Sequence, residues 1–110
     1  MKASNEARVQ DRHSEGIMLT LCEIGLMTVD KPENYDARAN LMWAATNALN
    51  GWIGLGQSQD WMTHSIGHEL TAEYNMDHGQ TLAVILPSLL YELRESRKEK
   101  LLQFASRVWN

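Results

Sequence analysis

The fold is decided by residues 64–90, HSIGHELTAEYNMDHGQTLAVILPSLL, which contain two helical segments separated by one short turn. The first segment keeps its apolar residues at helical spacing as far as about Tyr74. Residues 75–77, Asn-Met-Asp, are of the types that favour a turn, and a very apolar helix is expected over about residues 80–90. Pro87 should kink or restart that helix, because proline has no N–H to donate. The stretch therefore predicts two helices joined by a turn.

The segments on both sides also repeat apolar residues every three or four positions, which is typical of helices. We expect helices over about residues 6–27, 35–50 and 91–109, and we expect the helix before the turn to begin near Ser58 or Asp60. The positions expected to be buried are Val9, Ile17, Leu21 and Ile24 in the first helix and Leu41, Met42, Ala45 and Leu49 in the second. The pattern predicts an all-α bundle of about five helices.

The length and composition fit one domain spanning residues 1–110, since 44% hydrophobic residues in 110 supply a single modest core. The net charge of −4 comes without a basic stripe, which argues against nucleic-acid and membrane partners. The first apolar stretch, residues 17–27, is interrupted by Glu23, so we expect neither a signal peptide nor a membrane span. Together with a single cysteine, these features predict a soluble, cytoplasmic protein.

Three isolated features have ordinary structural interpretations. Residues 51–56, GWIGLG, are expected to form a buried, tight turn with Gly51 as a left-handed helix cap. A phosphate loop is disfavoured there, because no lysine follows and no strand precedes. We interpret His13 as structural or solvent-facing and Cys22 as a small core residue.

Three of the four histidines, His64, His68 and His78, are close together in the sequence. His64 and His68 lie four residues apart and so share one helix face, with Cβ atoms about 6 Å apart. His78 follows a turn that could fold it back over that helix. Neutral imidazoles are good ligands for iron, zinc, nickel or cobalt, although this spacing also fits ordinary polar residues. The zincin pattern is absent, because Ser65 rather than glutamate follows the first histidine.

These histidines carry a resemblance to a known family. The run from His64 to Gly79, followed by residues 81–87, resembles the signature of the iron-containing alcohol dehydrogenases. Residues 35–51 and 59–64 are similar to the NADPH-dependent, butanol-dehydrogenase-like branch of that family. The resemblance implies a dehydroquinate synthase-like architecture, in which an α/β domain binds NAD(P) and an all-helical C-terminal domain holds the metal. This chain matches part of the helical domain.

The resemblance also implies a function, the NAD(P)-dependent interconversion of alcohols and aldehydes. The family site uses one aspartate and three histidines on a divalent metal, iron or zinc. By motif position, His64 and His78 would be two of those metal ligands. His68 would be the catalytic residue beside the nicotinamide and the substrate. Asp77 stands where many members have proline, as it does in the butanol-dehydrogenase-like branch.

Two parts of the family site have no counterpart here. The other two ligands form an Asp-x-x-x-His pair, but Asp11 and His13 are two residues apart and Asp36 is followed by Asn40 at the fourth position. The glycine-rich cofactor loops are also absent. We therefore expect a fragment that binds metal weakly and is inactive alone, with NADP(H) implied for the full-length family only. A free-standing, non-catalytic helical interaction module and a small metal-sequestering protein are the alternatives.

The partners follow from the same interpretation. Side chains that contact the rest of the bundle and the cofactor domain in the family should face water here, and the candidates are Trp52, Ile53, Val108 and Trp109. We expect the chain to self-associate or to bind a separate cofactor-domain polypeptide.

Overall fold

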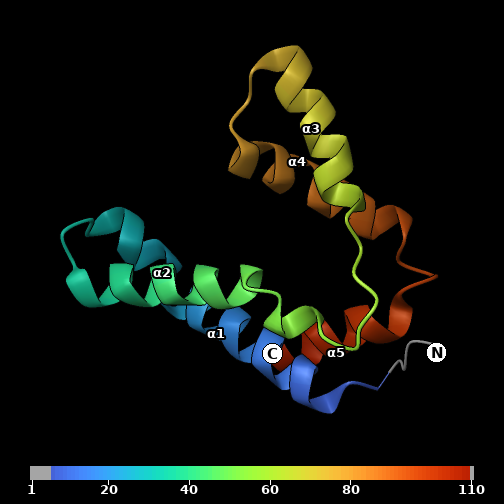
Figure 1. Cartoon of the computed structure of the whole chain (residues 1–110), viewed down its shortest axis with the longest axis horizontal. Coiled ribbons are helices and arrows are strands. Elements are labelled where there is room, and N and C mark those ends of the chain that lie inside the picture. Colours follow the sequence, from blue (N-terminus) through green and yellow to red (C-terminus); the bar gives the residue numbers. More distant parts are fainter. Residues whose placement is uncertain (1–5, 110) are drawn as a thin grey trace. The chain divides into compact units, whose positions relative to one another are not determined.

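A computed structural model describes residues 6–109, which form five α-helices and one short 3₁₀ helix, with no strand among them. The elements are α1 (Arg8–Asp30), α2 (Tyr35–Leu49), η1 (Trp52–Gly54), α3 (Met62–Tyr74), α4 (His78–Glu92) and α5 (Lys98–Val108) (Figure 1). The predicted all-α fold of about five helices is confirmed. None of the helices in the described part of the chain is long and apolar enough to cross a membrane.

The chain divides into two compact units. The first unit contains the residues up to Ser58 together with those from Phe104 onward, and the second unit contains Gln59–Gln103. Helix α5 therefore begins in the second unit and ends in the first. The predicted histidine site lies wholly within the second unit.

In the first unit, α1 and α2 pack side by side (Figure 1). The Asn34 side chain accepts a hydrogen bond from the Ala37 N–H at 3.0 Å, which caps the start of α2. Ala37 and Ala44 are only 3% and 6% exposed, and their seven-residue spacing places them on one helix face. Their short side chains let the two helices approach closely, so the alanines define the buried face of α2.

The predicted buried face of α2 is wrong. Leu41, Met42 and Leu49 are exposed, and so is Ala45. In α1, Val9 is also exposed, whereas the other three expected positions are half-buried, and α1 itself extends to Asp30. Helical periodicity identifies an apolar face but cannot tell which face a neighbouring helix covers. Here the buried side chains of α2 are alanines, α2 packs against α1 and η1, and the larger side chains remain in contact with solvent.

The glycine-rich segment after α2 forms a tight turn, as predicted. Gly51 has φ of 89°, a left-handed conformation that glycine adopts without strain. The turn is less buried than predicted, because Leu55 is exposed. Trp52 is exposed, as expected for a side chain that faces water, whereas Ile53, for which the same was expected, is half-buried.

The Trp52 ring packs edge-on against His13, with ring centroids 5.8 Å apart. The backbone carbonyl of Trp52 accepts a hydrogen bond from the Gln10 side chain. His13 thus has a structural contact, and its side chain is exposed, in agreement with both parts of its interpretation.

Two further burial predictions are wrong. Cys22, expected in the core, is exposed on α1. Val108, expected to face water, is buried near the end of α5. The end of α5 is held by Arg107, which forms an ion pair with Glu15 at 3.1 Å, and this anchoring accompanies the burial of the neighbouring valine. Trp109 remains exposed, as expected.

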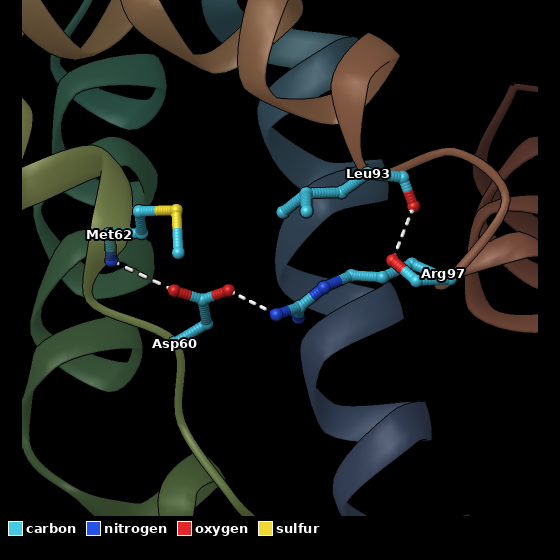
Figure 2. A network of polar contacts seen from close by, with 5 residues as sticks. Asp60, Met62, Leu93 and Arg97 are labelled. Atoms are coloured by element: carbon cyan, nitrogen blue, oxygen red, sulfur yellow. Dashed lines mark hydrogen bonds and ion pairs between the residues drawn. The ribbon is translucent and has the colours of Figure 1, made fainter.

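In the second unit, Asp60 organises the start of α3 (Figure 2). Its carboxylate accepts a hydrogen bond from the Met62 N–H at 2.8 Å and another from the Arg97 guanidinium. The Arg97 backbone N–H in turn donates to the Leu93 carbonyl at 3.0 Å. Helix α3 begins at Met62 with Trp61 at its N-cap, two residues after the predicted Asp60. Asp60 lies just before this cap and links the start of α3 to the turn that follows α4. This ion pair is partly exposed, so its role is geometric rather than strongly stabilising.

The predicted start of the last helix is wrong, whereas the ends of the last two helices lie within two residues of those expected. Helix α4 continues through Pro87 to Glu92, because a proline removes one helical hydrogen bond and the flanking turns keep theirs. The chain then breaks its helix over residues 93–97 before α5 begins, although one helix was expected from about residue 91. At the break, the Ser96 hydroxyl donates to the Leu93 carbonyl at 2.9 Å, a local hydrogen bond that competes with helix formation.

Candidate metal site

The turn between α3 and α4 brings the three predicted histidines together. Asn75 has φ of 52°, and this left-handed residue ends α3. His64 and His68 lie in the first half of α3, and His78 is the first residue of α4. The chain returns along α3 before α4 begins (Figure 1). The ring of His78 therefore lies near those of His64 and His68.

The imidazole of His78 is central to the cluster. Its ring centroid is 5.3 Å from that of His64 and 5.9 Å from that of His68. His64 is half-buried, whereas His68 and His78 are exposed. A solute can therefore reach the cluster from solvent without any rearrangement of the helices.

The His64 and His78 imidazoles have the spacing that two ligands of one metal ion require. Zinc–imidazole nitrogen bonds measure about 2 Å, so two imidazoles on one tetrahedral ion have ring centroids about 5 Å apart. The separation of 5.3 Å between His64 and His78 fits that requirement. Within residues 6–109, no group of three or more His, Cys, Asp or Glu side chains is arranged to hold an ion. The residues therefore fit a two-imidazole partial site rather than a complete one.

Trp61 is a neighbour of this cluster that sequence reasoning missed. Its ring packs edge-on against His64, with centroids 4.9 Å apart, and its indole N–H donates to the Gln59 side chain at 3.1 Å. The available signal was its position three residues before His64, which places both on one face if the helical path begins early. This edge-on contact limits the orientations that the His64 imidazole can adopt.

The chain is similar to known proteins over nearly its whole length, which includes the three histidines. The family model described as the Fe-containing alcohol dehydrogenase family, C-terminal, matches residues 2–110. The NADPH-dependent aldehyde reductase YqhD of Escherichia coli is 60% identical over 105 residues, which are 96% of this chain and 27% of that protein. The NADH-dependent butanol dehydrogenase A of Clostridium acetobutylicum is 38% identical over 104 residues, 94% of this chain and 27% of its own length.

The fold of this chain is also similar to that of a solved relative. The substrate- and cofactor-free form of the aldehyde reductase YqhD from E. coli superposes with a TM-score of 0.94 at 58% identity, covering 97% of this chain and 28% of that one. The chain thus spans about a quarter of the length of the relatives it matches.

Proposed function

Because the chain belongs to the iron-containing alcohol dehydrogenase family, we propose that it is the metal-binding helical part of an NAD(P)-dependent alcohol or aldehyde oxidoreductase. The observation that carries this proposal is the 5.3 Å separation of the His64 and His78 rings, which fits two ligands of one ion. The matched residues make up 27% of that aldehyde reductase, so the proposal concerns the helical part of the site and not the whole reaction. A cytoplasmic location belongs to the same proposal.

The three histidines have different roles in this proposal. His64 and His78 hold iron or zinc, which when bound supplies Lewis-acid polarisation of an alcohol or carbonyl oxygen. Trp61 restricts the orientation of the His64 imidazole through their edge-on contact. His68 is exposed beside His78, and its imidazole is available to contact the nicotinamide of NADP(H) and a small alcohol or aldehyde.

We expect the purified chain to show no NADPH consumption with butyraldehyde. Hydride transfer requires the cofactor to be held against the substrate, and residues 2–110 match only the C-terminal model of the family. A polypeptide from a relative that carries both the cofactor domain and the Asp-x-x-x-His ligand pair, added in trans, should restore turnover that His78→Ala abolishes. Steady-state absorbance of NADPH is the measurement. Turnover by the chain alone, lost in His78→Ala, would contradict the expected inactivity.

Self-association of the isolated chain is the second expectation. The described residues expose many large apolar side chains, including Met42, Leu49, Trp52 and Trp109. Soluble monomers rarely leave extended apolar surface in water, and a specific dimer buries about 800 Å² per partner. Sedimentation velocity at micromolar concentration should therefore show a species larger than the monomer, and its share should rise with concentration.

Addition of a cofactor-domain polypeptide separates this proposal from its alternative. The exposed apolar side chains would also suit a helical interaction module that has lost catalysis. Binding of a cofactor-domain polypeptide without recovered turnover would favour that module. A chain that stays monomeric at every concentration would rule out self-association as the use of this surface.

A further inference from the structure

A close contact between α3 and α4 lies directly beneath the histidine cluster. Gly67, between His64 and His68, is buried, and a Cβ atom placed there would lie 3.1 Å from the Thr81 hydroxyl oxygen. That Cβ would also lie 3.5 Å from the Thr81 Cβ and from a methyl group of Leu82. At Gly16, by contrast, the same added atom would meet nothing within 4 Å. The absence of a side chain at position 67 therefore allows the two helices to approach.

The other side of this contact is tied to His78. Thr81 has no exposed surface, and its hydroxyl donates a hydrogen bond to the His78 carbonyl at 2.8 Å. The Thr81 side chain thus touches α3 at Gly67 and its own helix at the residue that carries the imidazole. A displacement of Thr81 away from α3 would carry the first turn of α4, and His78 with it, in the same direction.

We propose that the Gly67–Thr81 contact sets the distance between the His64 and His78 imidazoles, so that both residues are positioning residues for the metal pair. This inference rests on the proposed metal-binding function of the pair. Addition of one methyl group at position 67 forces Thr81 to give way by a few tenths of an ångström. Metal–ligand distances in a good site lie within about 0.2 Å of their preferred values. A displacement of that size is therefore enough to weaken binding.

The experiment uses four chains: the unmodified chain, Gly67→Ala, Thr81→Ala and the double variant. Gly67→Ala is expected to lower Zn²⁺ affinity about tenfold, in the range found when groups that orient metal ligands are lost. Removal of the Thr81 hydroxyl and methyl groups makes room for the new methyl, so the double variant should bind as tightly as Thr81→Ala alone. The visible absorption spectrum of the Co²⁺-loaded chain should change in Gly67→Ala. In the double variant it should return to that of the unmodified chain. Gly16→Ala is the matched control and should change neither quantity.

A metal-free readout keeps the two proposals separate. In the apo chains, the nuclear Overhauser effect between the ring protons of His64 and His78 should weaken in Gly67→Ala and recover in the double variant. A chain without Zn²⁺ affinity whose ring contact follows this pattern would refute the metal proposal and support the spacing role. If the ring contact between His64 and His78 is as weak in the double variant as in Gly67→Ala, the spacing role is overturned. An unchanged ring contact in Gly67→Ala would overturn it as well.

Discussion

Zinc affinity is expected to fall about a hundredfold when His78 is replaced by alanine, because one of only two imidazoles in a partial site is then missing. His64→Ala should have a similar effect, since the two rings lie 5.3 Å apart on neighbouring helices. His68→Ala should change zinc affinity less, because its proposed role lies toward the cofactor and substrate. Isothermal titration calorimetry with Zn²⁺ measures all three.

The control for these substitutions is His13→Ala. His13 packs against Trp52 in the first unit, so its removal should leave zinc affinity unchanged. If His78→Ala and the unmodified chain bind zinc equally well, then His78 is not a ligand. If His13→Ala weakens binding as much as His78→Ala does, then the chain binds zinc non-specifically through exposed imidazoles.

Replacement of Ala44 by leucine is expected to destabilise the first unit by about 1–3 kcal/mol. Ala44 is 6% exposed on the face where α2 meets α1, so a larger side chain must push the helices apart. Ala45→Leu is the matched control, because the neighbouring alanine is exposed and its replacement should change stability by no more than about 0.5 kcal/mol. Urea unfolding monitored by circular dichroism at helical wavelengths gives both values.

The outcome that would contradict this packing is equally clear. Equal stability of the Ala44→Leu and Ala45→Leu chains would show that the alanine face does not hold α1 and α2 together. A stabilised Ala44→Leu chain would show that the helices leave a cavity there rather than a close contact.

The sequence predicted the helices and the turn well, because these depend on local chemistry. The apolar spacing in residues 64–74 and the turn residues that follow predicted α3 and the return of the chain. Asn75 takes the left-handed conformation that few residues adopt easily, which explains why the turn occurs there. The juxtaposition of His64, His68 and His78 followed from this turn and from the family resemblance.

What the sequence could not predict depends on contacts between distant residues. The periodicity of α2 marked Met42 and Leu49 as core, but only the packing against α1 shows that Ala37 and Ala44 are buried. The same limit applies to Gly67, which reads as an unremarkable glycine within a helix until Thr81 is placed 3.1 Å from its missing Cβ. Faces and distances are tertiary properties, and single-sequence patterns do not contain them.

The central claim is that His64 and His78 bind one metal ion together, and ¹⁵N-detected NMR of the imidazole nitrogens during a Zn²⁺ titration tests it most directly. The account predicts that one nitrogen of His64 and one of His78 shift together and saturate at one equivalent of zinc, while the His13 nitrogens stay unchanged. Separate saturation of His64 and His78, or shifts at all four histidines that follow zinc concentration without saturating, would contradict it.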